Sequence, residues 1–136
     1  MSSTAANKTV IVAGDDSAAI SQIIRILEHL GCDTRSAASP EEAENKALRC
    51  QAICLIVDLD SKGVDWLQTA IELRSHKELS RLSLIAASAD GGRGIELFSR
   101  IGELGLSGIE YLPLPASADE LDFRIRRIRL ARGQSI

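Results

Sequence analysis

Carboxylates end two apolar runs of this sequence. Asp15 and Asp16 follow the first run, and Asp58 and Asp60 close the second, Ile53–Asp60. A short apolar run without alternation is typical of a strand buried on both faces of a parallel sheet. Because ligands bind beyond the carboxyl ends of such strands, Asp58 is the first candidate for a residue that does chemistry.

A group of such carboxylates has a restricted chemistry. Like charges held a few Å apart repel one another, so the group either takes up a proton or binds a cation. Oxygen ligands from a few carboxylates, with positions left for water, suit Mg²⁺. For Asp15 and Asp16 the sequence leaves another interpretation open, in which they only cap the helix that follows.

Strands and helices are predicted to alternate along the chain and to position these acids. Ser39, Asp65 and Ser117 indicate helix starts, since each is a residue type that caps a helix N-terminus. The glycine-rich segment Gly91–Gly94 is predicted to be a loop. The predicted strands are the run that ends at Asp58 and the segments Thr9–Ala13, Cys32–Ala37, Leu82–Ala87 and Ile109–Leu112.

Five strands that alternate with five helices predict an α/β fold. The alternation requires parallel pairing with right-handed crossovers, which gives a doubly wound five-stranded parallel sheet in a flavodoxin-like three-layer sandwich. In that strand order the first and third strands are neighbours, so the two acidic turns are expected to converge. We expect one domain over residues 9–132, a flexible leader over 1–8 and a tail over 133–136.

Composition narrows the function classes. The net charge is −3 and the pI is about 5.4, so nothing favours nucleic acid or an anionic membrane as a partner. No apolar stretch approaches the ~20 residues of a membrane span. Aromatic residues make up 3% of the chain, which argues against a flavin site or a platform for single-stranded nucleic acid. Three cysteines and the lack of a signal peptide favour a reducing, cytoplasmic compartment.

Position by position, the chain resembles the receiver domain of bacterial two-component response regulators. The resemblance runs from about Thr9 to Arg132. It is carried by the acidic turn before the first helix, the segment Asp58–Asp65, Ser88 with the small residue after it, Tyr111 and Pro115.

The resemblance implies that Asp58 accepts a phosphoryl group from a histidine kinase or a phosphotransfer protein, with Mg²⁺ as helper. It implies that Asp15, Asp58 and the backbone carbonyl of Asp60 hold the metal, with Asp16 as a further candidate. A carboxylate oxygen is the nucleophile in such a transfer, and the metal neutralises charge on the transferring group. The chain is then a switch and not an enzyme, with slow self-dephosphorylation at most.

The resemblance also implies how the signal is read. Ser88 would hydrogen-bond a phosphoryl oxygen, and Tyr111 would swing inward on activation. The face made by the fourth helix, the fifth strand and the fifth helix would pair with a second copy of the domain, giving a homodimer, or with an output domain or partner protein.

Three positions depart from the family pattern. Gly14 stands where the first of two acids is usual, Leu114 replaces a lysine, and Lys62 replaces a proline. Loss of the lysine removes a charge-assisted contact to the phosphoryl oxygens worth ~1.5–3 kcal/mol, and Lys62 is a candidate substitute cation. Mg²⁺ binding is expected to be weak or lost.

The departures leave a second function open beside the phosphorylatable receiver. It is a pseudo-receiver that works as a protein-interaction domain without phosphorylation. A third interpretation, a small flavodoxin-like enzyme or cofactor carrier, is disfavoured because the sequence has few aromatics, no nucleotide fingerprint and no His–Ser or His–Cys pairing.

Overall fold

The structure of the chain, a computed structural model, describes residues 8–133. The predicted leader and tail lie outside these residues, apart from positions 8 and 133. Within the described range the elements are β1 Thr9–Ala13, α1 Ala18–His29, β2 Asp33–Ala37, α2 Pro40–Cys50, β3 Cys54–Asp58, α3 Trp66–Arg74, the 3₁₀ helix η1 Lys77–Leu79, β4 Ser83–Ser88, α4 Gly91–Leu104, β5 Ile109–Pro113 and α5 Ala118–Ala131.

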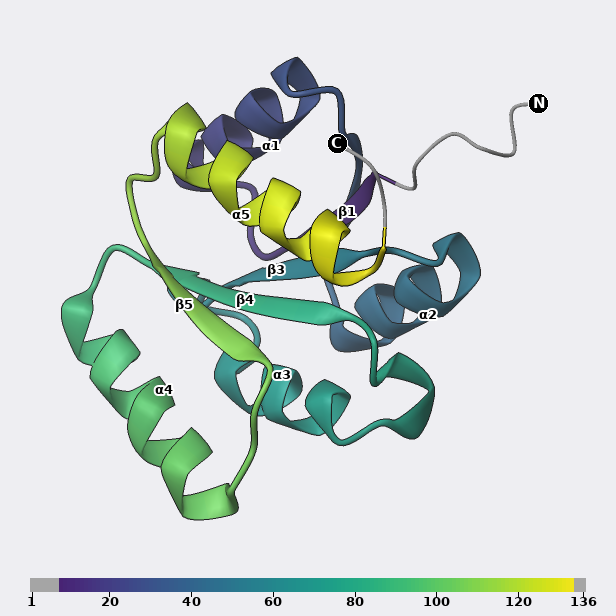
Figure 1. Cartoon of the computed structure of the whole chain (residues 1–136). Coiled ribbons are helices and arrows are strands. Elements are labelled where there is room, and N and C mark those ends of the chain that lie inside the picture. Colours follow the sequence, from purple (N-terminus) through teal and green to yellow (C-terminus); the bar gives the residue numbers. More distant parts are fainter. Residues whose placement is uncertain (1–7, 134–136) are drawn as a thin grey trace.

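The five strands form one parallel sheet in the order β2-β1-β3-β4-β5 (Figure 1). β1 and β3 are neighbours, with Val10 opposite Cys54 and Ala13 opposite Val57. Every residue of the central strand β3 is buried, as expected of an apolar run that does not alternate. The prediction of a doubly wound five-stranded parallel sheet, with the flavodoxin-like strand order, is confirmed.

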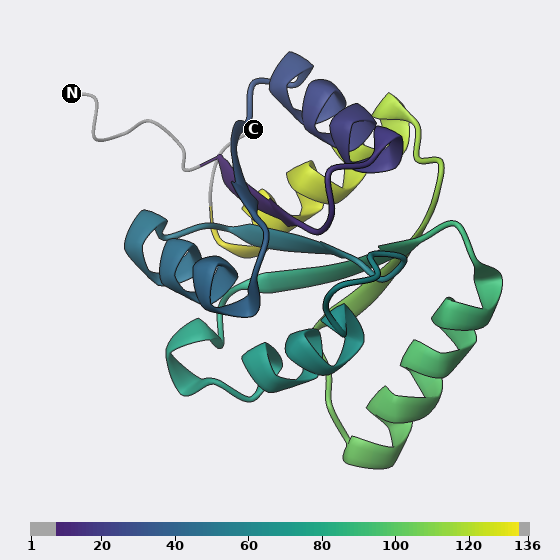
Figure 2. The same ribbon diagram turned by 180° about the vertical axis from the view of Figure 1, so that it is seen from behind.

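Helices cover both faces of the sheet and bury a core on each. α1 and α5 lie on one face, and α2, α3 and α4 lie on the other (Figures 1 and 2). Ile23, Leu27 and Ile125 are buried in the core beneath α1 and α5, and Leu67 and Leu97 in the core on the opposite face. No helix in the described part of the chain has the length and apolarity to cross a membrane.

Polar side chains fix where the helices begin. Ser39, Asp65 and Ser117 each accept a hydrogen bond from the backbone N–H three residues on, which confirms the predicted starts of α2, α3 and α5. These caps set the length of each preceding loop, and so the position of the residues at the strand ends.

One alternative interpretation and one prediction about helix starts are wrong. Asp15 and Asp16 do not cap α1, because Ser17 is its N-cap and accepts the hydrogen bond. The segment Gly91–Gly94 is not a loop but the first turn of α4. Asp90 caps this turn by accepting a hydrogen bond from the N–H two residues on, at 2.9 Å. The cap and the packing of α4 on the sheet outweigh the poor helix propensity of glycine.

Candidate functional site

Asp58 ends the central strand and is 4% exposed. Its Oδ1 accepts a hydrogen bond from the backbone N–H of Asp60 at 3.0 Å, and its Oδ2 accepts one from the Ser61 hydroxyl at 3.2 Å. Burial raises the pKa of Asp58, because desolvation penalises the charged form more than these two hydrogen bonds favour it. The charges of Asp60 and Asp15 raise this pKa further. The carboxylate is therefore fixed in position and poorly solvated.

A serine joins Asp58 to the turn after β1. The Ser61 hydroxyl, which donates to Asp58, accepts a hydrogen bond from the backbone N–H of Asp15 at 2.7 Å. The Asp15 carboxylate in turn accepts a hydrogen bond from the backbone N–H of Lys62 at 2.9 Å. The two acidic turns thus come together, but they meet through a hydroxyl and two backbone N–H groups.

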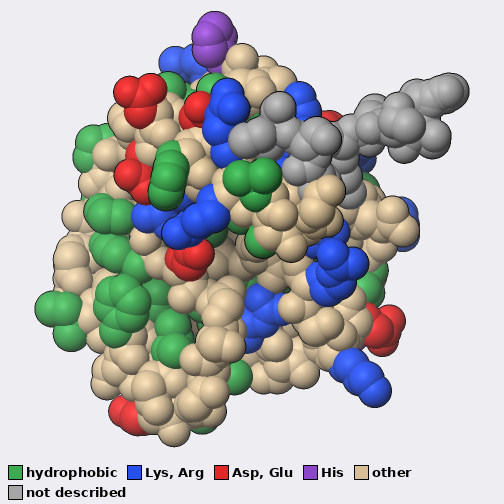
Figure 3. Space-filling view, viewed as in Figure 1, with side chains coloured by type: hydrophobic (Ala, Val, Ile, Leu, Met, Phe, Trp, Pro, Cys, Tyr) green, Lys and Arg blue, Asp and Glu red, His purple; other side chains and the backbone are tan. Residues whose placement is uncertain are grey.

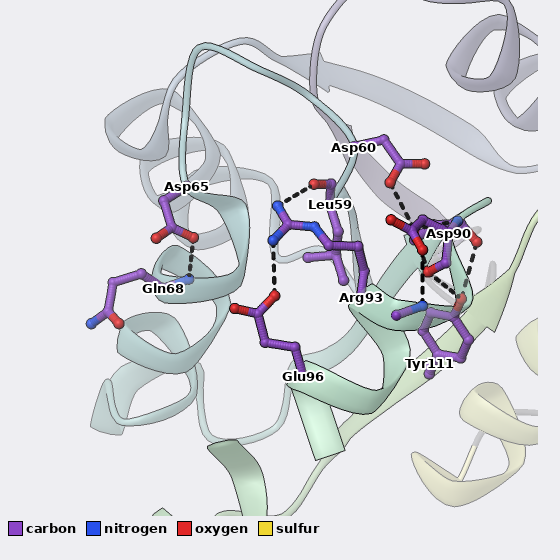
Figure 4. A network of polar contacts seen from close by, with 10 residues as sticks. Leu59, Asp60, Asp65, Gln68, Asp90, Arg93, Glu96 and Tyr111 are labelled. Carbon is purple, nitrogen blue, oxygen red and sulfur yellow. Dashed lines mark hydrogen bonds and ion pairs between the residues drawn. The ribbon is translucent and has the colours of Figure 1, made fainter. Parts of the chain in front are cut away.

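The side chain of Asp60 turns toward the end of β4 (Figure 4). Its Oδ1 accepts a hydrogen bond from the Ser88 hydroxyl at 2.7 Å, and its Oδ2 accepts one from the N–H of Ala89 at 2.8 Å. Ser88 is fully buried and also contacts the backbone of Asp90. The hydroxyl predicted to act as a switch is therefore engaged by Asp60 in this structure.

Tyr111, the predicted switch aromatic, points inward between β5 and α4. Its hydroxyl donates to the carbonyl oxygen of Ser88 at 3.2 Å, and its ring stands edge-on to Phe98 with centroids 6.2 Å apart. Gly94 makes room for the ring, since a Cβ there would lie 2.9 Å from two ring carbons. The position of the ring is therefore tied to the first turn of α4.

Arg93 connects α4 to the loop after β3, as Figure 4 shows. Its Nη2 donates to the carbonyl oxygen of Leu59 at 2.8 Å, and its Nη1 pairs with Glu96 at 2.9 Å. Arg93, Asp60 and Lys62 line one surface hollow of about 550 Å³. The loop after β3 is thus hydrogen-bonded to the turn after β1 on one side and to α4 on the other.

Comparisons with known proteins agree with this geometry. No family model matches the chain. The chain is 31% identical over 122 residues to "Probable transcriptional regulator ycf27" of Porphyridium aerugineum, covering 89% of this chain and 48% of that protein. A crystal structure assigned as a response regulator from Chloroflexus aurantiacus superposes with a TM-score of 0.71 at 27% identity, over 89% of this chain and 96% of that one. In sequence and in fold the chain is similar to the receiver domains of two-component response regulators.

A further similar structure is the receiver domain of the sensor histidine kinase PA1611 from Pseudomonas aeruginosa, which has a magnesium ion in its active-site cleft. It superposes with a TM-score of 0.71 at 22% identity, over 90% of this chain and 97% of that one. The chain spans about half the length of the curated relatives it matches, 48% of each. Receiver domains are signalling switches, and the fold found here is the fold of these domains.

This chain has no acid at position 14, and the structure shows which group lies nearby. A Cβ on Gly14 would lie 2.7 Å from the Cβ of Asp58 and 2.8 Å from the Oγ of Ser61. The φ angle of Gly14, +154°, also disfavours other residues. The Ser61 hydroxyl therefore lies 2.8 Å from the point where the side chain of the usual acid would begin.

At position 114, where the family has a lysine, this chain has an apolar residue, Leu114. It packs against the core beneath α1 and α5, and it lines a hollow of about 260 Å³ with Ala19 and Ala89. Lys62 contacts the site through its backbone N–H, while its side chain is exposed. Its role as a substitute cation stays a prediction.

Hydrogen bonds already reach the carboxylates that were predicted to bind Mg²⁺. Among residues 8–133, no group of three or more His, Cys, Asp or Glu side chains is placed to hold a metal ion. The Asp15 carboxylate accepts a hydrogen bond from the N–H of Lys62, and the Asp58 carboxylate accepts from the N–H of Asp60 and the hydroxyl of Ser61. The metal roles predicted for Asp15, for Asp58, for the backbone carbonyl of Asp60 and for Asp16 stay predictions.

Proposed function

We propose that Asp58 is the phosphoacceptor of this receiver domain and that its phosphorylation switches a protein-interaction surface. The observation that carries the proposal is the carboxylate of Asp58 at the carboxyl end of the central strand, held by one hydrogen bond on each oxygen. A carboxylate oxygen that accepts one hydrogen bond keeps a lone pair for attack on phosphorus.

The proposed donor is a phosphorylated histidine of a kinase or a phosphotransfer protein. An oxygen of Asp58 attacks phosphorus, an O–P bond forms and the N–P bond of the phosphohistidine breaks. The imidazole leaves with the electron pair and takes up a proton. The N–H of Asp60 and the hydroxyl of Ser61 orient the attacking carboxylate, which lowers the entropic cost of reaching the transition state.

The switch is proposed to run through Asp60 and Ser88. A phosphoryl group on Asp58 adds negative charge and strong acceptor oxygens close to the Asp60 carboxylate, which it repels. The Ser88 hydroxyl then leaves Asp60 for the phosphoryl group. Because the Tyr111 hydroxyl donates to the Ser88 carbonyl, this movement reaches β5 and α4.

The proposed partner surface is the face made by α4, β5 and α5. Figure 3 shows hydrophobic side chains over α4 and β5 beside charged ones from α5. Phe98 on α4 and Phe123 on α5 are 59% and 61% exposed, and Glu110 pairs with Arg124 and Arg127 beside them. Apolar area rimmed by charge is typical of protein interfaces. A second copy, an output domain or another partner protein is proposed to bind here, and sedimentation with and without a phosphodonor tests for the homodimer.

Intact-mass spectrometry after incubation with acetyl phosphate, with and without MgCl₂, tests the acceptor. We expect the wild-type chain to gain one phosphoryl group and Asp58→Asn to gain none. Asp33→Asn, which changes a carboxylate on the edge strand β2, is the matched control and should be phosphorylated like wild type.

The pseudo-receiver is the second candidate, favoured by Gly14 and Leu114. A wild-type chain that gains no phosphoryl group under any of these conditions would support it. The proposal for Asp58 would then fail, while binding of a partner to the face made by α4, β5 and α5 would still be expected.

A further inference from the structure

The Ser61 hydroxyl is bonded on both sides. It accepts from the N–H of Asp15 at 2.7 Å and donates to Oδ2 of Asp58 at 3.2 Å, and the residue is 7% exposed. A buried hydroxyl that both accepts and donates fixes the groups on either side of it. Ser61 therefore holds the turn after β1 and the end of β3 at one separation.

Gly14 is the residue that lets Ser61 take this position. Any side chain at position 14 would place a Cβ 2.8 Å from the Ser61 Oγ and 2.7 Å from the Cβ of Asp58, and both distances are shorter than real Cβ contacts. Position 14 also carries no charge, so the hydroxyl meets no competing carboxylate there. Gly14 and Ser61 therefore go together: the polar side chain next to Asp58 comes from the loop after β3 and not from position 14 in the turn after β1.

A second hydrogen bond joins the turn after β1 to the loop after β3. The backbone N–H of Lys62 donates to Oδ2 of Asp15 at 2.9 Å. A cation between Asp15 and Asp58 would need oxygen atoms of both residues to face it. In this structure the hydrogens of Lys62 and Ser61 point at Oδ2 of Asp15 and Oδ2 of Asp58, and a hydrogen with partial positive charge repels a cation.

We propose that Ser61 is a latch that keeps the acceptor site closed to divalent cations, and that Gly14 is the residue that admits it. This proposal rests on the function proposed for Asp58, since it concerns how the same site is opened. Opening breaks both hydrogen bonds of the Ser61 hydroxyl and frees Oδ2 of Asp58. The site with the latch therefore binds a divalent cation less tightly than the same site without it.

Titration of the full chain with MgCl₂, followed by amide chemical shifts in NMR spectra, measures this difference. We expect Ser61→Ala to bind Mg²⁺ about threefold to tenfold more tightly than wild type, the equivalent of one net hydrogen bond. Ser80→Ala, which changes an exposed serine before β4, is the control and should leave the affinity unchanged. Unchanged or weaker Mg²⁺ binding by Ser61→Ala overturns the latch.

Hydrogen exchange of the Asp15 amide gives a second, metal-free readout. Ser61→Ala removes the acceptor of that amide, and Gly14→Ala displaces it, so both variants should speed its exchange while Ser80→Ala does not. An Asp15 amide that exchanges at the wild-type rate in Ser61→Ala contradicts the proposal. Neither measurement needs phosphoryl transfer, so a chain that takes no phosphoryl group refutes the acceptor function alone, and the Mg²⁺ and exchange data still decide the latch.

Discussion

Replacement of Gly94 by alanine tests the inward position of Tyr111. The added methyl carbon would lie 2.9 Å from two ring carbons, well inside the ~3.5–4.0 Å at which carbon atoms attract. Overpacking of this kind costs ~1–3 kcal/mol, and the better helix propensity of alanine returns up to ~1 kcal/mol. The net result is a loss of about 0–3 kcal/mol in the free energy of unfolding, with the ring pushed away from α4.

Gly102 provides the matched control in the same helix. A Cβ there meets nothing within 4 Å, so Gly102→Ala should stabilise the chain by up to ~1 kcal/mol. Urea denaturation should therefore separate the two variants by ~1–3 kcal/mol. In a Tyr111→Ala background the obstacle is gone, and Gly94→Ala should then behave like Gly102→Ala.

Fluorine NMR reports the ring directly, because the chain contains one tyrosine and 3-fluorotyrosine gives one resonance. We expect Gly94→Ala to move the Tyr111 resonance and Gly102→Ala to leave it in place. The reasoning is refuted if Gly94→Ala stabilises the chain as much as Gly102→Ala and the resonance does not move. Tyr111 would then not lie against α4, and its position would not depend on the first turn of that helix.

Three further predictions concern single side chains. Burial raises the pKa of Asp58, so at pH values between the ordinary carboxyl pKa and the raised one the native state holds a proton that the unfolded chain has lost. The free energy of unfolding should therefore fall as the pH rises through this window. Urea denaturation at these pH values checks this, and the unfolding free energy of Asp58→Asn should depend less on pH. Arg74 donates to the carbonyl oxygens of Leu79 and Leu82, and Arg74→Lys should cost ~1–3 kcal/mol of unfolding free energy in urea because an ammonium lacks the planar fork. Leu114→Lys restores the family's cation and should speed phosphorylation by acetyl phosphate about tenfold or more in intact-mass time courses, and an unchanged rate would show that position 114 does not reach the phosphoryl group.

The fold was predictable because its signals are local. The apolar run before Asp58 has no alternation, and only a strand covered on both faces can bury it, so the parallel sheet followed from that pattern. Ser39 and Ser117 marked helix starts by their own hydrogen bonds to nearby backbone. The segment Gly91–Gly94 was mispredicted because the reason for a glycine there is a contact with Tyr111, which is distant in sequence.

The positions of the site residues were predictable, but their partners were not. Asp58 and Ser88 lie at strand ends, and the topology alone sets where strand ends meet. The contacts of Ser61 and Arg93 depend on how close the loop after β3 lies to the turn after β1 and to α4. Their residue types alone do not indicate these contacts. The missing acid at Gly14 was the available signal for Ser61, since a space left in a packed site must be filled by a neighbour.

The two departures at Gly14 and Leu114 change the charge of the site in opposite directions. An acid lost at position 14 removes one negative charge, and a lysine lost at position 114 removes one positive charge. Loss of the lysine alone would leave the carboxylates without a cation, which a buried site tolerates poorly, and loss of the acid removes one of the repelling negative charges. With both losses Asp58 keeps two hydrogen-bond donors, the hydroxyl of Ser61 and the N–H of Asp60, beside the like charges of Asp15 and Asp60. Such a site holds its acceptor oxygen without a cation, so the departures are compatible with an intact nucleophile, and the step they weaken is the recruitment of charged helpers.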